Sequence, residues 1–134
     1  LNDAGGSLCE IEDISVFDIL ARNTLIIYIE ATEQNERDVI ERAKRDPKPL
    51  YFRENFLDEN LSIYLQENNL EYVAQVDPDD FARWVFPRLF YERIPRYQAI
   101  AEQYGYKVSS EQIAKVKHEQ DFLEVIRDVL AREQ

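Results

Sequence analysis

The sequence has very few of the residues on which several classes of site depend. Its 134 residues include one cysteine, Cys9, so no disulfide can form within the chain. One histidine, His118, together with that cysteine is too little for a zinc site of the His/Cys type. His118 stands in a polar stretch and is interpreted as a surface residue, so we predict no catalytic triad or Cys-His pair.

Long apolar runs and a basic surplus are also missing. No stretch reaches the roughly 18 apolar residues of a membrane-spanning helix, and the N-terminus lacks the pattern of a signal peptide. The formal net charge is -11, which disfavours binding to the phosphate backbone of nucleic acid. We therefore predict a cytoplasmic protein with a mostly solvated acidic surface that binds neither nucleic acid nor membrane.

Methionine is absent, and the chain begins with Leu1. We interpret residues 1–134 as a single domain or as a fragment of a longer protein. The sequence holds only three glycines and no G-x-x-x-x-G-K-[ST] loop, the motif whose backbone amides cradle nucleotide phosphates. Such a loop, if the protein has one, is expected before Leu1.

The clearest strand signal runs from Thr24 to Ile29. It is short, apolar and β-branched, which is typical of a strand covered on both faces in a parallel sheet. Thr32 is expected to cap a helix over about 33–44, which completes a βα unit. An exposed apolar edge invites aggregation, so this strand is expected to have neighbours on both sides. The chain offers few candidates, and strands before Leu1 are expected to supply the rest.

Helical patterns dominate the rest of the chain. Helices are predicted at about 12–21, after a cap at Asp58, over about 79–104, from Ser109 to about 116, and over about 119–132. Pro87 and Pro95 are expected to kink or break the long helix, and Gly105 to end it. A short strand is expected at 106–108. The predicted class is α/β, helix-rich, with a parallel sheet.

Three segments carry groups suited to phosphoryl transfer, which needs cations or amide donors around the moving phosphoryl group and a Mg2+ ligand. The first begins with Asp3, which we expect at the end of a strand, where it could hold Mg2+ through water. Gly5 and Gly6 follow and allow backbone amides to approach an anion. An ordinary turn is the alternative interpretation.

The second segment is a basic, proline-stiffened stretch at about 45–55. Arg45 and Lys48 could act there as a lid over phosphates, or could simply offset the helix dipole. In the third segment, Arg93 and Arg96 are three residues apart and share a helical face. They could grip an anionic substrate, or could pair with nearby acids such as Glu92.

In this order, the segments resemble the second half of a shikimate-kinase-like P-loop kinase. The resemblance rests on Asp3-Ala4-Gly5-Gly6, on the strand at 25–29 followed by Glu30-Ala31, on Lys48-Pro49-Leu50, and on the run from Arg93 to Ala101. It implies the C-terminal part of a three-layer P-loop NTPase fold, with ATP and Mg2+ as cofactors and a small-molecule phosphate acceptor. Lys48 stands where the family has a lid arginine, and about 56–83 forms an inserted helical segment.

The resemblance also implies a role for each candidate residue. Asp3 would orient Mg2+, and Arg45 and Lys48 would act catalytically from the lid. Gly5, Gly6, Arg93 and Arg96 would bind the acceptor.

The predicted function is a P-loop kinase-like ATPase segment that contributes lid and acceptor-side residues to Mg-ATP-dependent phosphoryl transfer. The chain alone is expected to be inactive. The alternative is a non-enzymatic, acidic, helical protein-interaction module. A homodimer formed through the apolar strand is a third hypothesis.

Overall fold

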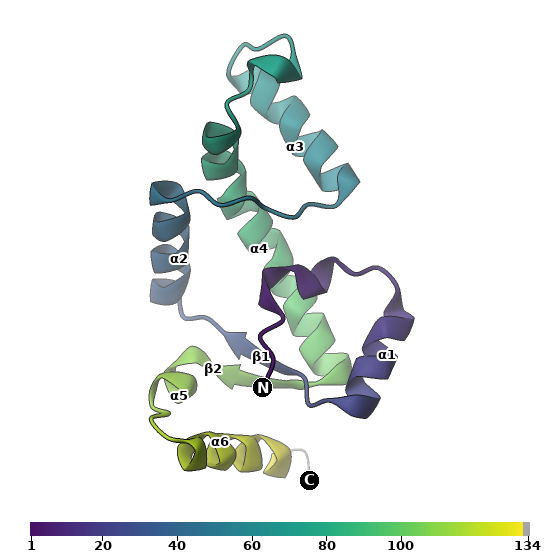
Figure 1. Ribbon diagram of the computed structural model, residues 1–134, viewed down its shortest axis with the longest axis vertical. Coiled ribbons are helices and arrows are strands. Elements are labelled where there is room, and N and C mark those ends of the chain that lie inside the picture. Colours follow the sequence, from purple (N-terminus) through teal and green to yellow (C-terminus); the bar gives the residue numbers. More distant parts are fainter. Residues whose placement is uncertain (133–134) are drawn as a thin grey trace. The chain divides into compact units, whose positions relative to one another are not determined.

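The computed structural model of the protein describes residues 1–132, which form helices and two short strands (Figure 1). The architecture is mostly helical and α/β-like. Its elements are the 3-10 helix η1 (Gly5–Glu10), α1 (Ile14–Asn23), β1 (Ile27–Glu30), α2 (Glu33–Arg45), α3 (Glu54–Glu67), the 3-10 helix η2 (Val73–Gln75), α4 (Pro78–Tyr104), β2 (Tyr106–Ser109), α5 (Ser110–Ala114) and α6 (Glu119–Ala131).

The two strands form a parallel pair. Ile27 lies opposite Tyr106, and Glu30 lies opposite Ser109. Parallel strands need a long crossover between them, and here the crossover contains α2, α3 and α4. Lys107 Nζ also lies 3.1 Å from Glu30 Oε1 across the pair. The predicted strands at 24–29 and 106–108 are therefore confirmed, with boundaries shifted by up to three residues.

Within residues 1–132, β1 has one neighbouring strand, β2, in line with the expectation that the chain offers few partners. That further strands before Leu1 complete the sheet stays a prediction. The side chain of Ile29 is also 49% exposed, although its apolar character predicted burial. The physical reason is that a two-stranded sheet gives each strand one partner and leaves much of its surface uncovered.

Capping side chains set several helix boundaries as predicted. The Asn35 N–H donates to Thr32 Oγ1 at 3.2 Å, which caps α2. Ser109 and Gln112 form the expected capping box, since each side chain accepts a hydrogen bond from the backbone N–H of the other. Helix α4 ends at Tyr104, immediately before Gly105.

Two local predictions are wrong, and a third is wrong in one of its two alternatives. Helix α3 begins at Glu54 and not after Asp58, because the extended residue Arg53 serves as its N-cap. Helix α4 has no break at Pro87 or Pro95, since each proline removes one intrahelical hydrogen bond and the neighbouring turns retain theirs. The alternative, a kink at these prolines, stays a prediction. No strand forms near Asp3, because the chain turns directly into η1.

The chain divides into two compact units, each built from two segments. The first unit combines Leu1–Glu10 with Asp38–Arg93, and its core lies between α3 and the first part of α4. Buried members of this core are Phe56, Tyr64, Phe81, Val85 and Leu89, with Leu50, Phe52, Leu57, Leu61, Leu70, Val76 and Trp84 packed against them. Leu50 and Phe52 therefore anchor the loop after α2 to this core.

The second unit combines Ile11–Arg37 with the chain from Ile94 onward. Val108 of β2 is 1% exposed, and the ring of Phe17 stacks on Tyr104 with 5.6 Å between centroids. Tyr28 of β1 stacks on Tyr97 at 5.5 Å. Burial raises the pKa of Tyr28, and the charges of nearby carboxylates add to that effect. Aromatic pairs thus connect β1 and α1 to the later part of α4.

The backbone of Gly105 is tightly packed against Ile26 in this second unit. A Cβ there would lie 2.4 Å from the Ile26 carbonyl oxygen, which accepts the Tyr106 N–H that begins the strand pairing. We predict that Gly105→Ala lowers the free energy of unfolding by about 1–3 kcal/mol, the usual cost of overpacking. Urea denaturation measures this loss. Gln103→Ala, at an exposed position nearby, is the control and should change stability by less than about 0.5 kcal/mol.

Candidate functional site

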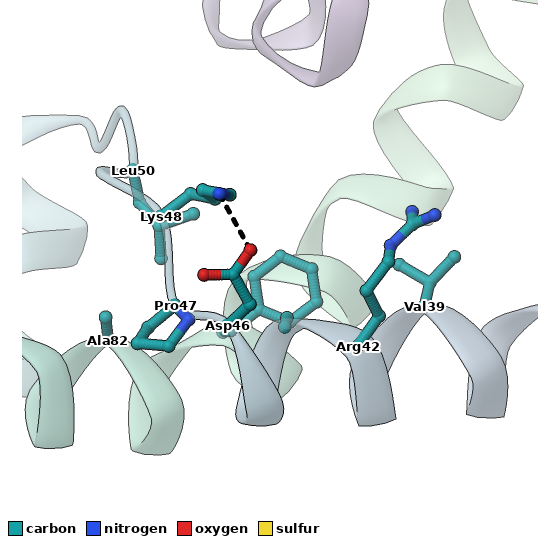
Figure 2. Close-up of a pocket in the computed structure, with 9 residues that line it drawn as sticks. Val39, Arg42, Asp46, Pro47, Lys48, Leu50 and Ala82 are labelled. Atoms are coloured by element: carbon teal, nitrogen blue, oxygen red, sulfur yellow. Dashed lines mark ion pairs between the residues drawn. The ribbon is translucent and has the colours of Figure 1, made fainter.

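A cavity of about 190 Å³ lies in the first unit between the end of α2, the loop after it and α4 (Figure 2). Its lining is Val39, Arg42, Ala43, Asp46, Pro47, Lys48, Leu50, Ala82 and Phe86. The residues from α2 are spaced by three or four positions, so they lie on one face of the helix. The cavity occupies the segment that the sequence predicted to be a lid.

The charged groups of this cavity carry a local positive excess. Lys48 Nζ lies 2.7 Å from Asp46 Oδ2, and both side chains are more than half exposed. Hydrogen bonding from Lys48, together with its positive charge, lowers the pKa of Asp46. Arg42 adds a second cation and forms no ion pair within residues 1–132. Two cations and one carboxylate thus line the cavity, on a chain whose formal net charge is -11.

The cavity also has apolar walls. Val39, Leu50 and Phe86 are each half-buried and present hydrocarbon to it. Ligand pockets are mostly apolar with a few placed polar groups. The combination of hydrocarbon walls with two cations therefore suits an anionic molecule that has an apolar body.

A buried ion network holds the other end of this loop. The Glu10 side chain is 2% exposed, and Arg93 Nε and Arg53 Nε lie 2.7 and 2.9 Å from its two carboxylate oxygens. Arg53 Nη2 also lies 2.8 Å from Glu92 Oε1. Arg93 Nη2 donates to the Tyr51 carbonyl oxygen at 2.7 Å. The network therefore joins η1, the loop after α2 and α4 within the first unit.

The predicted lid residues occupy different positions. Lys48 lines the cavity, whereas Arg45 is the exposed last residue of α2 and is not among the lining residues. Arg42, and not Arg45, is the arginine of α2 that lines the cavity. The spacing 39, 42, 43 and 46 carried the signal for Arg42, because it continues the face of α2 that holds Val39 and Ala43.

The two predicted acceptor-binding arginines fall in different units. Arg93 lies in the first unit, within the network around Glu10, and is 13% exposed. Arg96 lies in the second unit and is half-buried on α4. Their roles as acceptor-binding residues stay predictions. Glu10 was missed from the sequence because an isolated acid beside apolar residues gives no sign of its distant partners.

Asp3, Gly5 and Gly6 form an exposed turn at the start of the chain. The Gly5 N–H donates to Asp3 Oδ1 at 2.9 Å, and Gly5 has a φ of 64°, in the left-handed region that favours glycine. The Cys9 thiol lies 3.7 Å from the Gly6 carbonyl oxygen. This is the turn that the sequence allowed as an alternative, and a role in anion or acceptor binding stays a prediction.

The described residues contain no cluster that could hold a metal by itself. Among residues 1–132, no group of three or more His, Cys, Asp or Glu side chains is so arranged. Mg2+ is usually held by one or two carboxylates together with substrate phosphates. The role of Asp3 as a Mg2+ ligand stays a prediction.

Comparison with known protein families, with curated proteins and with solved structures finds no match to this chain. A search of the same described residues finds no helix long and apolar enough to cross a membrane.

The Glu10 network yields a prediction about stability. Glu10→Gln should lower the free energy of unfolding by about 3–5 kcal/mol, because it leaves two guanidinium groups without their shared buried carboxylate. Chemical denaturation followed by circular dichroism measures this change. Glu33→Gln removes the charge from an exposed pair with Arg37 and should cost less than about 1 kcal/mol. Equal losses for the two variants would show that the network contributes no more than a surface pair.

Proposed function

We propose that this chain is a segment of a P-loop kinase-like ATPase that contributes the lid and acceptor-side residues to Mg-ATP-dependent phosphoryl transfer to a small molecule. A cytoplasmic setting, where Mg-ATP is abundant, belongs to the same proposal. The chain contains no phosphate-cradling motif, so the proposal assigns it no role in holding the nucleotide's phosphates.

The observation that carries the proposal is the parallel pairing of β1 with β2, in which β1 leads directly into α2 and then into a cationic loop. Parallel strands with helical crossovers characterise α/β proteins, whose ligands bind beyond the carboxyl ends of the strands. At that edge Asn35 Oδ1 accepts hydrogen bonds from the Thr32 and Ser110 hydroxyls, at 2.9 and 2.6 Å. Polar side chains thus gather where such folds bind their ligands.

The proposed chemistry is electrostatic. Lys48 and Arg45, from the lid, offset the negative charge that develops on the moving phosphoryl group. Asp3 orients Mg2+ through water, and the metal supplies charge neutralisation at the phosphates. Backbone amides of Gly5 and Gly6 are proposed to face the acceptor. Arg93 and Arg96 are each proposed to bind the acceptor, and Arg93 also holds the Tyr51 carbonyl at the end of the lid.

A second candidate is the acidic protein-interaction module. The observation that favours it lies on α1, where Ile14 and Ile19 are 64% and 60% exposed. Exposed apolar side chains on one short helix are typical of surfaces that contact other proteins. This candidate predicts no ATP binding by the natural protein.

The kinase-like proposal predicts Mg-dependent ATP binding and turnover by the natural gene product that carries this chain. Lys48→Ala or Arg45→Ala should lower kcat by about 100-fold, the usual effect of removing one group that stabilises developing charge. A coupled ATPase assay and calorimetry measure turnover and binding.

Lys117→Ala is the control, because it removes an exposed cation outside the lid and should leave both quantities unchanged. If the natural protein neither binds nor hydrolyses Mg-ATP, the kinase-like proposal is wrong and the interaction module is favoured. Turnover that is insensitive to both lid substitutions would remove Lys48 and Arg45 from the mechanism.

A further inference from the structure

We propose that the cavity between α2, the loop after it and α4 binds a small organic anion with a single ring, and that the anionic group of this ligand replaces Asp46 as the partner of Lys48. The inference deepens the proposed function and rests on it in one respect, which is the treatment of Lys48 as a cation that serves an anionic ligand. It names the class of molecule that this part of the lid accepts.

The volume of the cavity sets the size of the ligand. At about 190 Å³, it is smaller than the roughly 300–1,000 Å³ of pockets that enclose drug-sized molecules. An apolar cavity of about 150 Å³ accommodates benzene. The space therefore suits one six-membered ring with a substituent.

The walls match a ring. Val39 and Ala43 from α2 and Ala82 and Phe86 from α4 present hydrocarbon, and Phe86 offers an aromatic face. Aromatic pairs in stacked or edge-to-face arrangements gain more than their buried area alone provides. An apolar or aromatic ring is thus the body that these walls would hold.

The charges at the rim match an anion. Lys48 and Arg42 contribute two positive charges and Asp46 one negative charge, which leaves an excess of one positive charge. Carboxylates and phosphates both accept charge-assisted hydrogen bonds from cations of this kind. The shared ligand chemistry is therefore an anionic oxygen group attached to a ring.

Asp46 already occupies the position expected for that anionic group. Figure 2 shows the Asp46 carboxylate and the Lys48 ammonium turned toward each other, with Arg42 about one turn earlier on α2. The pair is short, at 2.7 Å, but solvent-exposed, and exposed pairs contribute little net free energy. An incoming anion held by the ring can therefore displace Asp46 without a large penalty.

The test uses the 134-residue chain and two probes, phenyl phosphate and benzoate, which share a ring and differ in the charge of the anionic group. Binding is measured by NMR titration of the isotope-labelled chain. We expect both probes to shift the Ala43 and Ala82 methyl signals, and inorganic phosphate to bind more weakly because it lacks the ring. Absence of binding by both ring-bearing probes would overturn the inference.

Four variants then locate the site. Lys48→Ala and Arg42→Ala should each weaken binding of phenyl phosphate by about tenfold, the usual scale of a charge-assisted hydrogen bond. Asp46→Asn should strengthen it by about three- to fivefold, because the competing carboxylate is gone. Ala82→Leu fills the cavity, retains a good helix former and keeps every charge, so it should abolish ring-dependent binding. Unchanged binding by Ala82→Leu would place the probes elsewhere and overturn the inference.

The competition between Asp46 and the ligand for Lys48 is measured separately, by combining two substitutions. In the Lys48→Ala background, Asp46→Asn should strengthen binding by less than about twofold, since there is no shared cation left to release. A gain of the same size in both backgrounds would show that Asp46 acts only through its charge, which overturns the replacement of Asp46 by the ligand.

The outcome of these binding experiments is distinguishable from the outcome of the ATPase test of the proposed function. Probe binding to this chain, together with no Mg-ATP turnover by the natural protein, would support the cavity and overturn the kinase-like proposal. Turnover by the natural protein that depends on Lys48, without probe binding to the cavity, would support the kinase-like proposal and overturn the inference about the cavity.

Discussion

The buried carboxylate of Glu10 is the interaction on which the first unit depends. Two guanidinium groups, of Arg53 and Arg93, reach its two oxygens within 2.9 Å, at a side chain that is 2% exposed. A charge taken out of water at this depth is tolerated only when paired and hydrogen-bonded. The network therefore fixes η1, the start of α3 and α4 together, because losing any one partner leaves an uncompensated charge.

This network also sets the shape of the loop after α2. Arg93 holds the Tyr51 carbonyl at 2.7 Å, and the neighbouring residues Leu50 and Phe52 pack on the core. One end of the loop is thus held by charge and by apolar contacts. The other end keeps its cation, Lys48, in an exposed pair with Asp46. Because one end of the loop is fixed and the cation at its other end is solvated, the Lys48 side chain can change partner when an anionic ligand binds.

Short-range features were readily predicted from the sequence. The apolar, β-branched run before Glu30 predicted β1, the hydroxyls of Thr32 and Ser109 predicted caps, and Gly105 predicted the end of α4. Each depends on backbone preferences or on contacts within one helical turn. The cationic segment around Lys48 was likewise visible as a lid, although its role is a proposal.

The sequence by itself therefore determined both strands, most of the helices and the net charge of -11. Tertiary structure alone decided that Arg93 meets Glu10, 83 residues away, and that Arg42 faces the cavity where Arg45 does not. It also decided that the sheet of the described residues stops at two strands. The physical reason is the distance along the chain over which each feature forms. An ion pair or a strand partner that is distant in sequence produces no periodic pattern in either segment, whereas a helix face or a cap depends on residues within about one turn.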